Sequence, residues 1–190
     1  TPTPEMEAVA LTAKPEWKPE TPLHGKCRVN VSNYGFDNYG DLFTPRQLVA
    51  LTTFSDLVQE ARERVQRDAL QAGLPADPNP LRDGGTGATA YADAVGVYLA
   101  CGISRSADFW SSICIWANQP KNELVTHLFG RQAIPMAWDF AEANPFSDSG
   151  GNFSKNLSYV AMGIDYLAGC APGHAGLPRR RGHFRSPHRA

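Results

Sequence analysis

The sequence has no apolar run approaching the roughly 18 residues that are needed to cross a bilayer, so no membrane-spanning helix is expected. It also lacks an N-terminal stretch in which a charged segment precedes an apolar one, so we expect no signal peptide. The four cysteines form no Cys-x-x-Cys pair and are spaced too sparsely for a disulfide framework or a zinc ribbon. We therefore predict reduced thiols and a cytoplasmic location without a membrane partner.

Sites that depend on histidine are also missing. His24 and His127 lie 103 residues apart, and the remaining histidines fall in an arginine-rich tail without acids. No Ser-His-Asp or Cys-His arrangement stands out either. The sequence thus predicts no metal site and no catalytic residue in this chain.

The net charge of −1 hides an asymmetry between an acidic body and a basic tail. Residues 1–168 carry 13 Lys+Arg against 19 Asp+Glu, whereas residues 169–190 carry five arginines and no acid. Such a tail can bind nucleic acid by releasing counterions. Its Ala, Gly, Pro, Arg and His content is also what a reading-frame slip in GC-rich DNA yields. We interpret residues 169–190 as a disordered or frame-shifted tail.

Helical patterns dominate the body and predict a mainly α fold with at most one or two short strands. Residues 1–38 form a proline-rich lead-in, in which residues 5–11 can make one helical turn. Alternating side chains at residues 27–31 predict one short strand within it. Residues 39–168 form the helical segment.

The clearest element is a long amphipathic helix over residues 46–72. Thr44 is a good N-cap, Pro45 suits the first helical position, and Gln47 completes a capping box with Thr44. Apolar residues then recur at steps of three and four without an internal Gly or Pro, and Gly73 supplies the stop. The exposed backbone donors at the start of this helix also suit a carboxylate or a phosphate.

Three further helical stretches follow. Residues 88–116 predict a helix that breaks near residues 102–105 and resumes through residue 116. Residues 122–129 predict a short helix. Residues 154–167 place their apolar side chains on one face and predict a last helix that Gly169 ends.

Two short motifs resemble parts of nucleotide-modifying sites. The glycines of residues 83–87 resemble a cofactor loop, but the proline-rich stretch before them cannot supply the strand that such a loop needs, so we expect a hinge and helix cap. Asn144-Pro145-Phe146 resembles the Asn/Asp-Pro-Pro-aromatic motif that holds a flipped base, without the second proline. The simpler interpretation of this tripeptide is a turn with a buried Phe146.

Several strings in the body resemble one protein family. They are Tyr39-Gly40-Asp41-Leu42-Phe43-Thr44-Pro45-Arg46-Gln47-Leu48-Val49-Ala50-Leu51, Tyr91-Ala92-Asp93-Ala94-Val95, Tyr98-Leu99, Phe129-Gly130-Arg131-Gln132-Ala133-Ile134-Pro135-Met136, Trp138-Asp139-Phe140-Ala141-Glu142 and Asn144-Pro145-Phe146. In this order they resemble the middle segment of large bacterial and archaeal proteins, taken to be adenine-specific DNA methyltransferases with an inserted zinc ribbon. Some members occur at anti-phage loci. The resemblance covers roughly residues 1–168.

The resemblance implies a Rossmann-like methyltransferase that uses S-adenosylmethionine, of which this chain would be a helical part. The family's glycine-rich cofactor loop and zinc ribbon are expected upstream, and its Asp-Pro-Pro-Tyr motif downstream. This chain holds none of the three. The implied function is a fragment of a DNA methyltransferase acting on the adenine amino group, inactive alone, with DNA and the remainder of the parent enzyme as partners.

The resemblance also suggests individual site residues. Thr44 matches the Thr-Pro helix opening that other adenine methyltransferases use against the methionine part of the cofactor. Arg46 and Arg131 lie within the resembling strings and are the expected DNA-contacting residues. The alternative is a non-catalytic helical module that binds DNA or scaffolds a defence complex.

Overall fold

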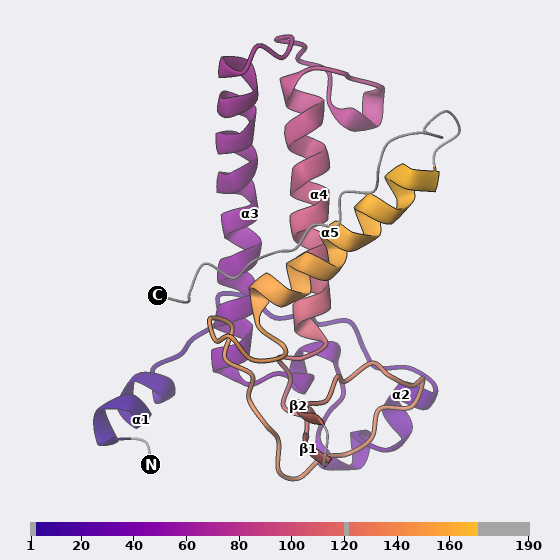
Figure 1. Cartoon of the computed structure of the whole chain (residues 1–190). Coiled ribbons are helices and arrows are strands. Elements are labelled where there is room, and N and C mark those ends of the chain that lie inside the picture. The colour runs from indigo at the N-terminus through magenta and orange to yellow at the C-terminus, as the bar shows by residue number, and fades with distance from the viewer. Residues whose placement is uncertain (1–2, 120–121, 171–190) are drawn as a thin grey trace.

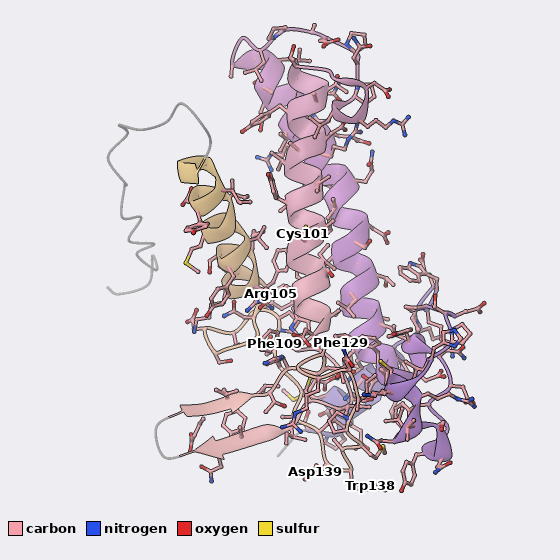
Figure 2. All side chains as sticks on the ribbon, turned by 90° about the vertical axis from the view of Figure 1, so that its right-hand side faces the viewer. Cys101, Arg105, Phe109, Phe129, Trp138 and Asp139 are labelled. Atoms are coloured by element: carbon pink, nitrogen blue, oxygen red, sulfur yellow. The ribbon has the colours of Figure 1, made fainter. Side chains whose placement is uncertain are left out.

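The computed structural model describes residues 3–119 and 122–170. Its largest feature is a pair of antiparallel helices, α3 (Pro45–Gln71) and α4 (Ala88–Ala107), which pack against each other (Figure 1). A third helix, α5 (Phe153–Cys170), packs against α4 and diverges from the hairpin toward its own C-terminal end (Figure 2). The prediction of a mainly α fold is confirmed.

Irregular chain forms a base below the helical hairpin (Figure 1). This base contains the short helix α2 (Lys26–Val29) and one antiparallel pair of strands, β1 (Trp116–Gln119) and β2 (Asn122–Val125). Helix α1 (Pro4–Leu11) precedes the base and has no buried residue. The core lies in the base and consists of Leu23, Val31, Leu42, Trp110, Ile113, Cys114, Val125, Leu128, Ile134 and Ala143.

The ends of α3 form as the sequence predicts. Thr44 Oγ1 accepts a hydrogen bond from Gln47 N at 3.3 Å, and Gln47 Oε1 accepts one from Thr44 N at 2.9 Å. After the helix, Gly73 adopts a φ of 91°, a conformation that favours glycine. Leu74 N then donates to Ala69 O at 3.0 Å and closes the helix end.

A half-buried ion pair ties α3 to α4. The Arg62 guanidinium lies 2.6 Å from Asp93 Oδ1, and the second oxygen of Asp93 accepts the Leu81 backbone N–H at 3.0 Å. The same carboxylate therefore fixes the helix pair and the turn that leads into α4.

Helices α4 and α5 approach closely at Gly102. A Cβ at this position would lie 3.1 Å from Leu157 Cδ1, so glycine permits the contact. One turn later, Asn156 Nδ2 donates to Ser106 Oγ at 3.1 Å in a buried environment. The last predicted helix is thus confirmed and is anchored by a polar pair. Its predicted end at Gly169 is wrong, because α5 continues through this residue to Cys170.

The strand predicted at residues 27–31 is wrong, because residues 26–29 form α2. Among residues 3–119 and 122–170, no strand pairs with this segment. Tertiary contacts fix it instead, since Val31 is fully buried and Asn30 Nδ2 donates to Ile134 O at 3.2 Å. An alternation of five residues is too short to decide between these outcomes.

Two predicted helical stretches are also wrong. Helix α4 continues through residues 102–105 and ends at Ala107, and no second helix follows over residues 109–116. The chain turns there because Trp110, Ile113 and Cys114 enter the core. Residues 122–125 form β2 rather than a helix, and their register places Trp116 opposite Val125.

None of the helices in the described residues is both long and apolar enough to cross a membrane. Most of the predicted basic tail, residues 171–190, lies outside the described residues.

Candidate functional site

A cavity of about 310 Å³ lies beside the first turn of α3. This volume is at the lower end of the range for small-molecule sites. Its walls come from α3, from the segment after α4 and from residues 142–145. The lining residues are Arg46, Gln47, Ala50, Trp110, Glu142, Ala143, Asn144 and Pro145.

Backbone hydrogen bonds hold the far wall of the cavity in place. Ala141 N donates to Cys114 O at 2.8 Å, and Phe153 N donates to Pro145 O at 3.0 Å. Residues 141–145 are therefore fixed at both ends, by the core and by the start of α5. Trp110 adds a rigid apolar wall, since its indole N–H donates to Gly151 O at 2.7 Å.

Gln47 is the unusual polar residue of this cavity. Its side chain is almost completely buried, and its Nε2 has no hydrogen-bond partner within the described part of the chain. The amide orientation follows from Thr44 N, which requires Oε1 as its acceptor. An unmade hydrogen bond of this kind costs about 1–3 kcal/mol. The cavity lining thus includes a residue whose buried amide N–H group is unpaired within the described part of the chain, next to the apolar surface of Ala50 and Trp110.

The Arg46–Glu142 ion pair forms the charged rim of the cavity. Arg46 Nη2 donates to Glu142 Oε2 at 2.8 Å, and both side chains remain partly exposed. A positive charge in the first turn of a helix opposes the helix dipole. The carboxylate of Glu142 compensates this arginine within the chain.

Asp41 orients the chain that leads into α3. Burial raises the pKa of this carboxyl, but hydrogen bonds from Asn38 N, the Lys18 ammonium and Asp37 N together hold the pKa below its usual value. Asp41 and Asn38 also form a reciprocal capping box. The carboxylate therefore fixes the turn that positions Thr44 and the cavity.

The Asn144-Pro145-Phe146 turn is confirmed, but the predicted burial of Phe146 is wrong. Asn144 Oδ1 accepts the Phe146 N–H at 2.9 Å, and the Phe146 side chain is 84% exposed. The turn aims the ring outward beside Phe54, with 5.9 Å between the ring centroids. An exposed aromatic ring thus stands next to the cavity.

The glycine loop before α4 is filled by its own chain. Cβ atoms at Gly85 and Gly87 would collide with the carbonyl oxygens of Asn79 and Pro75. The N–H groups of Asn79 and Thr86 are bound by Asp77, and these bonds lower the pKa of its carboxyl. The loop therefore does not fit S-adenosylmethionine. The expected helix cap is confirmed, since Gly87 is the N-cap of α4, and the hinge stays a prediction.

The structure brings two of the three predicted site residues together. Thr44 and Arg46 lie at the start of α3 beside the cavity, where the Thr44 hydroxyl caps the helix. Arg131 is exposed in a different part of the base and does not line the cavity. Its segment is attached to the lead-in, since Cys27 Sγ donates to Gln132 O at 3.0 Å. The predicted contacts of these residues with cofactor and DNA remain predictions.

The sequence does not identify Trp110 and Glu142 as cavity residues. Trp110 lies in a stretch that the sequence predicts to be helical, and Glu142 lies within one of the resembling strings. Each acquires its role through contact with α3, about 60 and 96 residues away in the chain. No local pattern carries that information.

Within the described residues, no group of three His, Cys, Asp or Glu side chains is arranged to hold a metal ion. Comparison of the chain with protein-family models, with curated proteins and with solved structures finds no match in any of the three.

Proposed function

We propose that this chain is the helical part of an S-adenosylmethionine-dependent DNA methyltransferase that acts on the adenine amino group. In this proposal the chain supplies a ligand cavity and DNA contacts, and the Rossmann-like part of the parent enzyme supplies the cofactor site. The chain is then inactive alone, because methyl transfer requires both reactants to be held together.

The cavity beside α3 is the observation that supports the proposal. The strings at residues 39–51, 138–142 and 144–146 carry much of the resemblance, and each contributes to this cavity or its rim. Residues separated by almost a hundred positions therefore share one site. Segments that share a ligand site are expected to form a common pattern within a family.

In this proposal, the buried amide of Gln47 donates to an acceptor atom of the bound group. Arg46 pairs with Glu142 at the rim of the cavity. When this ion pair breaks, Arg46 can instead contact a DNA phosphate. Trp110 and the exposed Phe146 supply apolar surface for a flat ring. Thr44 keeps the helix start in place.

The exposed apolar side chains favour a second possibility, a non-catalytic scaffold. Large side chains such as Trp138 (75% exposed), Tyr166 (69% exposed) and Leu167 (67% exposed) lie on the surface. Apolar surface of this kind marks contact with other proteins or domains. The same surface can be covered by the remainder of the parent enzyme, so the scaffold alternative requires a separate test.

Methyl transfer separates the two possibilities. The chain alone and the product of the complete reading frame are each incubated with methyl-labelled S-adenosylmethionine and adenine-containing DNA. We expect label on adenine from the complete protein and none from the chain alone. A complete protein that binds DNA but transfers no label supports the scaffold. Label transferred by the isolated chain contradicts the assignment of the cofactor site to another part.

The cavity is tested in the complete protein with Gln47→Met, which removes the amide while keeping a long side chain. Tyr91→Ala, on the exposed face of α4, is the control. We expect Gln47→Met to lower methyl transfer at least fivefold and the control to leave it unchanged. Equal activity of the two variants would exclude the cavity from the reaction.

A further inference from the structure

Four side chains from three segments form a continuous row of cation–π and tilted ring contacts at the lower end of α4. The Arg105 guanidinium lies 4.4 Å from the ring centroid of Tyr159 on α5, and 5.8 Å from the ring centroid of Phe109. The Phe109 ring lies 5.9 Å from that of His127, which follows β2. We call these four residues the Arg105 stack.

The stack is accessible to a ligand. Tyr159 and the His127 side chain are each 53% exposed, and Arg105 is exposed as well. Phe129, whose ring is 45% exposed, follows His127 closely in the chain. Figure 2 shows Arg105, Phe109 and Phe129 where α4 meets the base. Aromatic surface therefore continues along this side of the molecule.

Arg105 differs from the paired arginines of the chain. Arg46 and Arg62 form ion pairs with carboxylates, whereas no carboxylate of residues 3–119 or 122–170 lies within ion-pair distance of Arg105. The nearby Asp108 is occupied, because it accepts the Phe129 N–H at 2.6 Å and lies 3.4 Å from His127 Nδ1. Two ring faces hold the Arg105 guanidinium. Because no carboxylate of the described residues pairs with it, its N–H donors can bind an external anion.

We propose that the Arg105 stack is a binding surface for single-stranded DNA. Exposed rings offer faces on which bases stack without regard to sequence, and the arginine contacts the phosphate between them. Bases in a duplex are already stacked on one another, so a duplex cannot use these faces. The choice of DNA as the ligand rests on the proposed function. The location of the binding surface and its preference for single-stranded DNA go beyond that function.

Binding of a fluorescent oligothymidine of about 20 nucleotides to the 190-residue chain tests the proposal by fluorescence anisotropy. Tyr159→Ala removes a ring of the stack. Tyr91→Ala is the matched control, because Tyr91 has the same exposed fraction of 53% and lies on the first turn of α4. We expect Tyr159→Ala to weaken binding about 5- to 150-fold, as the loss of one stacked base does. The control should change it less than twofold.

Thermal unfolding followed by circular dichroism shows whether Tyr159→Ala alters folding. If it does, two further variants test the proposal. His127→Ala removes an exposed ring at the other end of the stack and should also weaken binding. Arg105→Lys keeps the charge but loses the flat guanidinium, so it should weaken binding and preserve the salt dependence.

The proposal is overturned if the chain does not bind the oligonucleotide, or if Tyr159→Ala and His127→Ala both match the Tyr91→Ala control. Duplex DNA that binds as tightly as the single strand also overturns it, since backbone charge would then explain the affinity. If the binding assay contradicts the Arg105 stack, the proposed function is still tested by the methyl-transfer assay of the complete protein. The two proposals can therefore fail separately.

Discussion

Arg46 on the first turn of α3 pairs with Glu142 at 2.8 Å, although 96 residues separate them in the chain. The pair explains why an arginine is tolerated where the helix dipole disfavours it. It also joins two strings of the resemblance at one cavity. The side chains are 43% and 37% exposed, so the ion pair holds the geometry of the cavity more than it stabilises the fold.

A double-mutant cycle of Arg46→Ala and Glu142→Ala measures this relationship. We expect a coupling energy of about 0.2–1 kcal/mol in thermal or urea unfolding, which decreases as salt is added. If Arg46 also contacts a DNA phosphate, Arg46→Ala reduces the salt slope of DNA binding by about one, and Glu142→Ala increases affinity by freeing the arginine. If Arg46→Ala leaves the salt slope of DNA binding unchanged, Arg46 pairs only with Glu142 and does not contact a phosphate.

The Thr44 cap makes a second prediction. Thr44→Ala removes the acceptor of Gln47 N and should lower the free energy of unfolding by about 0.5–2 kcal/mol, whereas Thr44→Ser should preserve it. Urea denaturation of the three proteins checks this. If Thr44 also contacts S-adenosylmethionine in the complete enzyme, Thr44→Ala weakens cofactor binding beyond the effect of lost stability. If the loss of cofactor affinity in Thr44→Ala is fully explained by its loss of stability, Thr44 acts only as a helix cap.

A third prediction is that the contribution of Asp93 to the free energy of unfolding depends on pH. Hydrogen bonds from Leu81 N and from Arg62 hold the pKa of this carboxyl below its usual value, against burial, which raises it. A carboxyl with a lowered folded-state pKa stabilises the fold above its unfolded-state pKa, and the stabilisation is lost as the pH falls through the folded-state pKa. At pH 7, Asp93→Asn should cost about 1–2 kcal/mol, and this difference from the wild type should shrink below about pH 4.

Urea denaturation at pH 7 and at low pH checks this prediction. Asp83→Asn is the control, because Asp83 is exposed and lies 3.8 Å from Arg82. Its effect should be small at every pH. A difference between Asp93→Asn and the wild type that stays constant with pH would contradict the account of the Arg62–Asp93–Leu81 contact.

The glycine loop makes a fourth prediction. Gly87→Ala should lower the thermal midpoint by several degrees, because its Cβ would collide with the Pro75 carbonyl. Gly163→Ala is the matched control, since nothing lies within 4 Å of its Cβ and alanine favours the helix by up to about 1 kcal/mol. An unaffected Gly87→Ala would show that the loop is open and would revive the cofactor-loop interpretation.

The sequence by itself determined α3 and most of α5. The Thr44–Gln47 capping box, the apolar spacing and Gly73 all act within a few residues, and α3 begins and ends where these signals are. The apolar face of residues 154–167 also predicts α5, although it does not define where that helix ends. Short-range hydrogen bonds and one apolar face are enough to define an element of this length.

Only the tertiary structure decided the base, the cavity and the Arg105 stack. Residues 27–31 and 109–116 are too short to hold their own conformation, so burial of Val31 and Trp110 and hydrogen bonds to distant carbonyls determined it. The cavity depends on Arg46 meeting Glu142, and the stack on α5 crossing α4 at Arg105. These contacts form between segments far apart in the chain, and their energy comes from burial, ion pairing and cation–π contact, which local sequence patterns do not encode.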